Sequence, residues 1–267
     1  MPRTPYLVAT RQGAVYRIRL NRPRRGNALN YGMIGAAARA LKQLEEDFSV
    51  RVVVVEGAGP DFCTGDDPVD MGPWPEKLSH RKPGGSHGPA PVPEQELLKT
   101  IRHLPKPTIA VLHGSVLAEG LDIACVCDIR VCADDTVLGD PRILQARFSA
   151  TGLTYVLPRL IGQSQAARIL LLGEQVDGKE AERIGLVYRS FPPKDFQRET
   201  EELIRRVAAM ATRSYAVIKE QILGQLDLPY QAALMHSMAV RQTNVIEDRS
   251  EGARAFIEKR KPEYKGR

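Results

Sequence analysis

The chain has 267 residues, of which 43% are hydrophobic and 26% are charged, and its formal net charge is +6 at pH 7. This length and apolar content allow a full hydrophobic core, so a disordered protein is excluded. No apolar run approaches the roughly 20 residues of a membrane-spanning helix, and the N-terminal Met-Pro-Arg-Thr-Pro-Tyr lacks the apolar segment of an export signal. We therefore expect a cytoplasmic protein with no membrane partner.

The cysteines are too few for a disulfide scaffold in a chain of this length. They are Cys63, Cys125, Cys127 and Cys132. Their spacing is not that of a zinc site, and apolar residues flank Cys125 and Cys127. We predict reduced, buried thiols and no metal site.

The excess of basic residues favours an anionic partner. Aromatic residues make up only 6% of the chain, and the positive charge is diffuse. Nucleic-acid binding needs stacking aromatics or a basic stripe, so we expect a phosphate-bearing small molecule and no nucleic acid.

The N-terminal segment alternates between strand and helix patterns. Residues 7–10 and 14–20 read as two strands around a turn at Gln12-Gly13. Apolar residues at helical spacing predict a helix over 31–48. The run Val52-Val53-Val54-Val55 predicts a strand that is covered on both faces.

The middle of the chain continues this alternation. A stretch rich in proline and glycine, 72–93, predicts a mobile surface excursion that could form a lid over an acyl pocket. The elements predicted after it are a helix over 94–103, a strand over 108–112, a short helix over 122–127 and a strand over 129–132. This order indicates an α/β core.

The C-terminal part is predicted to be mostly helical, with one short strand at 186–190. The predicted helices cover 163–172, 178–184, 196–210, 214–225, 230–246 and 250–260. Pro192-Pro193 breaks the chain, so we place a boundary between a core at 1–195 and a helical region at 196–267.

Two glycine-containing loops follow predicted strands. The first covers 57–67 and the second covers 113–122, where it opens a helix. Ligands of open α/β sheets gather at the carboxyl ends of strands, and free backbone N–H groups at helix starts attract negative charge. Two such loops facing each other could stabilise an oxyanion.

Several motifs resemble the enoyl-CoA hydratase/isomerase (crotonase) superfamily. Asn21-Arg22-Pro23 with Asn27-Ala28-Leu29 resembles its "NRP…NAL", and 61–67 resembles "FCAGADL". The segments 106–114, 127–130, 157–162, 181–187 and 256–262 resemble its "KPVIAAVNG", "CDIRIA", "LPRLVG", "A…GLVN" and "FLEKRKP". The matches span nearly the whole chain in the family's order.

The resemblance implies an α/β spiral of ββα units with a C-terminal helical trimerisation region, assembled as a homotrimer or homohexamer. It implies an acyl-CoA thioester as substrate, no further cofactor, and an enolate held by the backbone N–H groups of Asp66 and Glu119. Such donors are each worth about 3–4 kcal/mol. The candidate acyl-CoA-binding residues are Arg24, Arg25, Ala28, Gly65, Asp66, Asp67, Gly120, Lys259 and Lys261.

The acid/base positions depart from the family pattern. Of the two glutamates of a hydratase, the first is Asp122 here and the second is Arg142, which cannot act as a base at neutral pH. The aspartate of many isomerases is Ala150. Two carboxylates are new nearby: Glu119 replaces a glycine of the oxyanion loop, and Asp140 lies two residues before Arg142. A carboxylate at Asp66 or Glu119 would oppose an oxyanion unless it points away.

Three hypotheses remain open. Asp122 with Glu119 or Asp140 could form a relocated acid/base pair, and the protein would then hydrate or isomerise an enoyl-CoA. Arg142 could instead hold an anionic group of the substrate, as in a decarboxylase or a C–C hydrolase, or pair with Asp122. The chain could also be a catalytically silent acyl-CoA binder.

Overall fold

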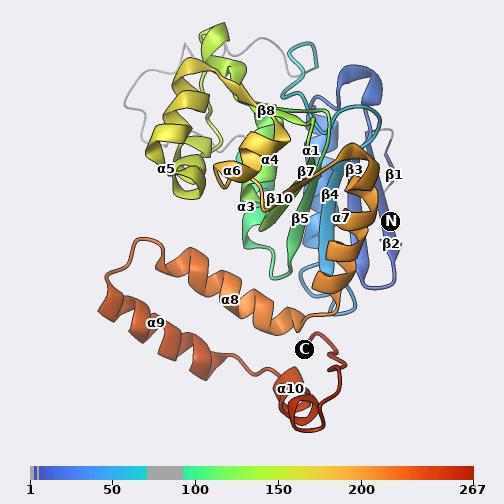
Figure 1. Cartoon of the computed structure of the whole chain (residues 1–267), viewed down its shortest axis with the longest axis vertical. Coiled ribbons are helices and arrows are strands. Elements are labelled where there is room, and N and C mark those ends of the chain that lie inside the picture. The colour runs from blue at the N-terminus through green and yellow to red at the C-terminus, as the bar shows by residue number, and fades with distance from the viewer. Residues whose placement is uncertain (1–2, 5, 71–92) are drawn as a thin grey trace.

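The computed structural model describes residues 3–4, 6–70 and 93–267, and within them the chain forms two β-sheets surrounded by helices (Figure 1). The larger sheet has seven strands in the order β1-β2-β3-β4-β5-β7-β10. Its strands are β1 (Arg3–Thr4), β2 (Leu7–Gln12), β3 (Val15–Leu20), β4 (Val52–Gly57), β5 (Thr108–Leu112), β7 (Ile129–Ala133) and β10 (Arg189–Phe191). The smaller sheet joins β6 (Ser115–Leu117), β8 (Val137–Gly139) and β9 (Gln175–Val176).

Strand direction divides the larger sheet. β2 and β3 pair in antiparallel register around the predicted turn, whereas the strands from β3 to β10 run parallel. Parallel strands need crossover segments, which here carry the helices. The α/β class and the first hairpin are therefore confirmed.

The helices fall into a group around the sheets and a group at the C-terminal end. The first group is the 3₁₀ helix η1 (Pro23–Arg25), α1 (Tyr31–Lys42), α3 (Pro93–His103), α4 (Glu119–Val126), the 3₁₀ helix η2 (Pro141–Gln145), α5 (Leu153–Leu172), α6 (Gly178–Arg183) and α7 (Pro193–Ala208). The second is α8 (Thr212–Gln225), α9 (Tyr230–Thr243) and α10 (Asp248–Ile257). No helix in the described ranges is both long and apolar enough to span a bilayer.

β4 is buried on both faces, as its valine run predicts. Val53 and Val55 belong to the main core, which also holds the apolar faces of α1, α3 and α4. Val52 and Val54 belong to a second cluster with Leu203 and other residues of α7. Alternate side chains of a strand point to opposite faces, so the sheet is enclosed between helical layers.

The helix α7 belongs structurally to the sheet rather than to the C-terminal group. Leu203, Ile204 and Val207 pack against β4, β5 and β7. The predicted boundary at 195/196 therefore falls inside α7, whereas Figure 1 shows α8, α9 and α10 leaving the body of the molecule. Lys219 of α8 ties this group to the core, because its buried Nζ lies 2.9 Å from Asp128 Oδ2.

Several predicted boundaries were wrong. The first helix ends at Lys42 instead of 48, and Phe48, counted as a core position, is 55% exposed. α4 begins three residues earlier than predicted, at Glu119. α5 begins at Leu153, but Gly162 interrupts its helical geometry, so its second part agrees with the helix predicted at 163–172. The sequence did not predict the short strands β6, β8 and β9. A strand of two or three residues is too short to show an alternation of apolar and polar side chains. The proline- and glycine-rich stretch at 72–93 lies almost wholly outside the described residues.

The burial expected for the cysteines is confirmed. All four are free and buried, and burial raises the thiol pKa of Cys63 to about 12. The thiol form therefore persists at neutral pH, and Cys63 acts as a small apolar side chain beneath the candidate site.

Candidate active site

The candidate site lies where two neighbouring parallel strands end. β4 and β5 are paired in parallel, so the loops that follow them leave the same edge of the sheet. The loops hydrogen-bond to each other: the backbone N–H of Cys63 donates to the Ser115 carbonyl at 3.1 Å, and the N–H of Leu117 donates to the Cys63 carbonyl at 2.9 Å. The two glycine-containing loops identified in the sequence are thus in direct contact.

Gly120 permits this close approach, and its replacement should separate the loops. A Cβ on Gly120 would lie 2.3 Å from the Cys63 carbonyl oxygen, which belongs to the backbone and cannot rotate away. We expect Gly120→Ala to lower the free energy of unfolding by about 1–3 kcal/mol, measured by urea denaturation. The control is Gly35→Ala in α1, where a Cβ meets only the mobile end of Arg39 and should stabilise the helix by roughly 0.5–1 kcal/mol. Equal urea midpoints for the two variants would contradict the steric argument.

The first turn of α4 presents two carboxylates on one face. Ala118, just before the helix, has a φ of 48°, which turns the chain sharply from β6 into α4. Glu119 and Asp122 follow at a spacing of three residues, which places side chains on the same side of a helix. Both residues are buried, with exposed fractions of 8% and 2%.

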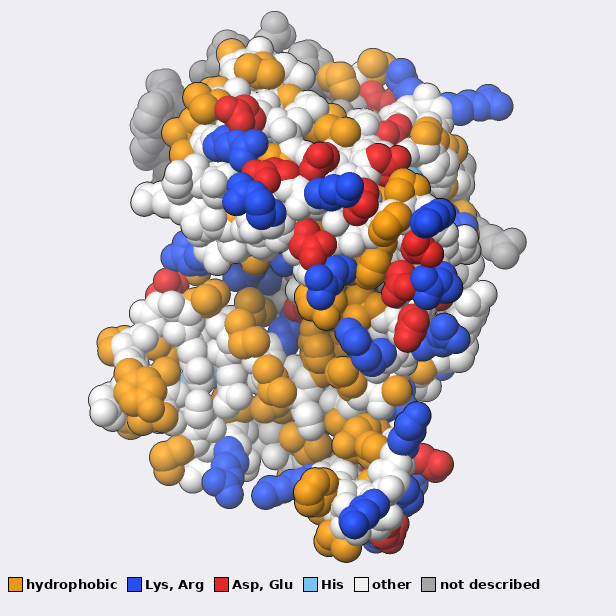
Figure 2. Space-filling model, viewed as in Figure 1, with side chains coloured by type: hydrophobic (Ala, Val, Ile, Leu, Met, Phe, Trp, Pro, Cys, Tyr) orange, Lys and Arg blue, Asp and Glu red, His pale blue; other side chains and the backbone are white. Residues whose placement is uncertain are grey.

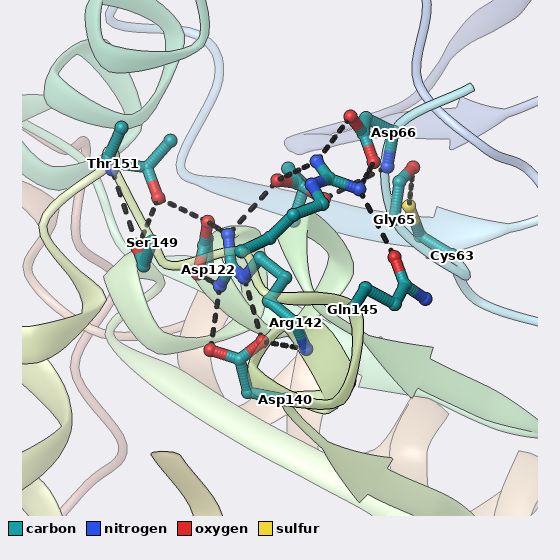
Figure 3. Close-up of polar contacts among 12 residues, drawn as sticks. Cys63, Gly65, Asp66, Asp122, Asp140, Arg142, Gln145, Ser149 and Thr151 are labelled. Carbon is teal, nitrogen blue, oxygen red and sulfur yellow. Dashed lines mark hydrogen bonds and ion pairs between the residues drawn. The ribbon is translucent and has the colours of Figure 1, made fainter. Parts of the chain in front are cut away.

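Arg142 lies at the centre of the acidic groups (Figure 3). Its Nη1 donates to Glu119 Oε1 at 3.0 Å and to Asp122 Oδ2 at 3.1 Å. Its Nη2 donates to Asp122 Oδ1 at 2.8 Å and to Asp140 Oδ2 at 3.1 Å, and its Nε donates to Asp140 Oδ1 at 2.7 Å. A guanidinium has five N–H donors, so all of them are used on three carboxylates.

The cluster is short of positive charge. Asp66 and Arg147 form an adjacent pair, so four carboxylates face two guanidinium groups. Burial raises the pKa of Asp122, against the opposing effect of Arg142, and burial likewise raises the pKa of Glu119. Because desolvation disfavours the charged form, these two carboxylates bind a proton more readily than exposed carboxylates do.

The backbone N–H of Asp66, an expected oxyanion donor, is occupied. It donates to Glu119 Oε2 at 2.9 Å. The Asp66 side chain points elsewhere: Arg147 Nη2 lies 2.6 Å from its Oδ2 and Arg147 Nη1 lies 3.1 Å from its Oδ1. Of the two side chains that could oppose an oxyanion, Asp66 is turned away and Glu119 is turned in.

Thr151 completes the surroundings of Asp122. Its Oγ1 donates to Asp122 Oδ2, and its hydroxyl also contacts Ser149 Oγ at 2.8 Å. Ala150, at the position of the isomerase aspartate, contributes only its backbone, whose carbonyl accepts from Gln95 Nε2 at 2.6 Å. The segment 149–151 therefore supplies hydroxyls to the site in place of a carboxylate.

The N-terminal candidate binding residues lie beside the first loop. Arg24 and Arg25 lie exposed on η1, and Arg25 Nε is 3.5 Å from Asp67 Oδ2. Burial would raise the pKa of Asp67, but hydrogen bonds from Arg22 and from backbone N–H groups outweigh it and lower this pKa. Arg22 also donates to the Ala28 carbonyl at 2.6 Å. Arg22 and Asp67 thus fix the loop, while Arg24 and Arg25 have exposed side chains.

The C-terminal candidates are not part of this arrangement within one chain. Lys259 and Lys261 are exposed and follow α10. In Figure 1, α10 lies at the opposite end of the molecule from α4. A role for these lysines at the site would require another copy of the chain.

Arg147 and Thr151 were not among the residues predicted from the sequence. Both lie in the irregular segment between η2 and α5. Arg147 belongs to no motif, and Thr151 lies next to Ala150 in the stretch 149–152 that matches an isomerase motif. Their contacts reach 81 and 29 residues back along the chain, to Asp66 and Asp122. No local signal in the sequence identifies Arg147, whereas Thr151 could have been considered as the neighbour of Ala150.

Comparison with known proteins shows which family this chain resembles. The family model described as enoyl-CoA hydratase/isomerase matches residues 10–267. The putative enoyl-CoA hydratase/isomerase YngF of Bacillus subtilis is 32% identical over 251 residues, covering 93% of this chain and 94% of its own. The mitochondrial enoyl-CoA hydratase of Pongo abelii is 29% identical, covering 97% of this chain and 88% of its own.

Solved structures agree with the sequence comparison. The enoyl-CoA hydratase of Bacillus anthracis superposes with a TM-score of 0.89 at 28% identity. The superposition covers 98% of this chain and 100% of the other. An enoyl-CoA hydratase/carnithine racemase of Magnetospirillum magneticum gives 0.84 at 29% identity, covering 99% and 97% of the two chains. With its α/β spiral, its C-terminal helices and its paired loops at the ends of β4 and β5, the chain belongs to the enoyl-CoA hydratase/isomerase (crotonase) superfamily.

Proposed function

We propose that this protein binds an acyl-CoA thioester and hydrates or isomerises an enoyl-CoA with a relocated acid/base pair, Glu119 and Asp122. The observation that carries the proposal is that both carboxylates contact the same guanidinium nitrogen, Arg142 Nη1, at 3.0 and 3.1 Å. A hydratase needs two carboxylates beside one water and one double bond. The shared nitrogen holds two buried carboxylates together directly beside the oxyanion loops.

The two carboxylates would divide the proton transfers of hydration. One takes a proton from water as the water oxygen bonds to C3 of the enoyl group, and the other delivers a proton to C2. Asp122 accepts three hydrogen bonds, two from Arg142 and one from Thr151, whereas Glu119 accepts two, one from Arg142 and one from the N–H of Asp66. Glu119 has fewer contacts to break, so it is the carboxylate that turns toward a substrate, and Asp122 is the one that stays in place.

A decarboxylase or C–C hydrolase that grips its substrate through Arg142 has less support. Arg142 is 2% exposed, and its donors are all engaged with Glu119, Asp122 and Asp140. An incoming anion would have to replace one of these buried carboxylates, which would then lose its partner at a cost of several kcal/mol.

A catalytically silent acyl-CoA binder is the second candidate. The contact between the Asp66 N–H and Glu119 favours it, because this donor is not free in the structure. The candidate differs from the first only in whether Glu119 and Asp122 exchange protons with the bound acyl group.

The expected homotrimer or homohexamer and the cytoplasmic location stay predictions. The C-terminal helices support an assembly, because they carry many exposed apolar side chains, visible over the lower part of Figure 2. These include Tyr230, Met235, Met238, Phe256 and Ile257. Many exposed apolar side chains on one group of helices are typical of a protein interface.

The proposal is tested with crotonyl-CoA, by following the loss of the conjugated enoyl absorbance, and with a 3-enoyl-CoA for isomerisation. We expect turnover of one of them, and a fall of roughly 10²-fold in kcat for Asp122→Asn, which removes one proton acceptor. Absence of turnover on both substrates, with butyryl-CoA still bound, would leave the silent binder.

A further inference from the structure

The Glu119 carboxylate contacts the backbone of the first loop, 57–67, at the expected oxyanion position. Its Oε2 accepts the Asp66 N–H at 2.9 Å, the donor that an acyl oxygen would need. A Cβ on Gly65 would lie 3.2 Å from the same oxygen, so the carboxylate is packed closely against the loop backbone. Burial raises the pKa of this carboxylate, and the N–H of Glu119 itself, the second expected donor, acts in the opposite direction.

Two arginines hold the other oxygen in place. Oε1 of Glu119 lies 3.0 Å from Arg142 Nη1 and 4.0 Å from Arg147 Nη2. The carboxylate therefore has positive charge on one oxygen and a backbone donor on the other. An anionic oxygen bound between backbone N–H groups is the arrangement that such a loop provides for an enolate.

We propose that Glu119 is a built-in competitor for the thioester-oxygen position: the acyl oxygen and the Glu119 carboxylate bind the same Asp66 N–H, and the site accepts an acyl thioester only when Glu119 has turned away. The proposal rests on the proposed acyl-CoA substrate. It concerns binding, however, and holds equally for an enzyme and for a silent binder.

Displacement of Glu119 is possible because Arg142 does not depend on it. With Glu119 gone, Asp122 and Asp140 still engage Nη1, Nη2 and Nε of Arg142. Four carboxylates face two guanidinium groups, so the departure of one carboxylate leaves no unpaired cation. Glu119 loses two hydrogen bonds when it turns away, the one from the Asp66 N–H, which the acyl oxygen takes over, and the one from Arg142 Nη1. A single hydrogen bond to a charged group corresponds to roughly 10- to 100-fold in a binding constant.

The test measures the affinity of the full-length chain for butyryl-CoA, a saturated thioester that cannot be hydrated, by titration calorimetry. We expect Glu119→Gly to bind it roughly 10- to 100-fold more tightly than the unmodified chain. Glu119→Gln should lie between them, because an amide oxygen still accepts from Asp66 but carries no charge. The Kd order is the readout, because a purely structural Glu119 would not produce it.

Two further variants keep the outcome interpretable. Glu119→Ala removes the carboxylate without the backbone freedom of glycine and should match Glu119→Gly. Glu180→Gly makes the same substitution in the first turn of α6, outside the acidic cluster, and should bind butyryl-CoA like the unmodified chain. Thermal unfolding of each variant establishes that it is folded.

Several results would overturn the proposal. These are an unchanged or weaker affinity in both Glu119→Gly and Glu119→Ala, an equal gain in Glu180→Gly, or no binding of butyryl-CoA by any variant. Failure of the proposed catalysis has a different signature, namely no turnover of an enoyl-CoA together with the tighter binding of the Glu119 variants.

Discussion

Replacement of Arg142 by methionine should lower the free energy of unfolding by about 3–5 kcal/mol, or prevent folding at 37 °C. Methionine keeps the apolar length of the side chain but leaves three buried carboxylates, Glu119, Asp122 and Asp140, without their common partner. Breaking a buried ion pair on one side is costly, because the remaining charges stay desolvated. Urea denaturation followed by circular dichroism measures the loss.

Two other variants separate charge from geometry in this experiment. Arg142→Lys keeps the positive charge but cannot reach three carboxylates with a planar fork, so an intermediate loss is expected. Arg168→Met removes an arginine whose ion pairs lie at the surface, and its urea midpoint should stay close to that of the unmodified chain. If Arg142→Met unfolded at the same urea concentration as Arg168→Met, the central role of Arg142 would be refuted.

The second large effect is expected at Glu119. Glu119→Gln should reduce kcat for an enoyl-CoA by about 10²- to 10⁴-fold, because an amide can neither take nor deliver the proton. The amide oxygen can still accept from Arg142 or from the Asp66 N–H, so the fold should be retained. Steady-state kinetics separates this loss from affinity: kcat should fall while acyl-CoA binding becomes tighter.

Asp140→Asn compares the two carboxylates that could partner Asp122. Asp140 accepts from the backbone N–H of Arg142 at 3.2 Å and caps η2, so its contacts are with Arg142 and not with the oxyanion loops. We expect a smaller loss of kcat than for Glu119→Gln. The reverse order would move the acid/base role from Glu119 to Asp140.

Local patterns in the sequence predicted much of the framework. The valine run of β4 predicted burial on both faces, and alternate residues indeed pack into two different cores. The helix α4, which follows β6, was predicted to begin too late in the chain. Its first residue, Glu119, is polar and interrupts the apolar pattern that marks a helix start. The helix α1 was predicted too long because Leu44 continues its spacing, although the chain turns there.

The candidate site was only partly predictable. The motifs identified the loops and the departures at Glu119, Asp122 and Arg142, but they did not tell whether Arg142 faces a substrate or its own chain. The five hydrogen bonds of its guanidinium decide this for the structure. Arg147, which turns the Asp66 carboxylate away from the loop, belongs to no motif.

The sequence by itself determined the α/β order of elements, the two loops at the strand ends and the family resemblance, because these depend on periodicity and on residues close together in the chain. Only the tertiary structure decided that Arg142 is enclosed by three carboxylates and that Glu119 occupies the Asp66 N–H. The physical reason is that, apart from the contact between Asp140 and Arg142, these contacts join groups 20 to 53 residues apart, and packing, not local sequence, brings them together.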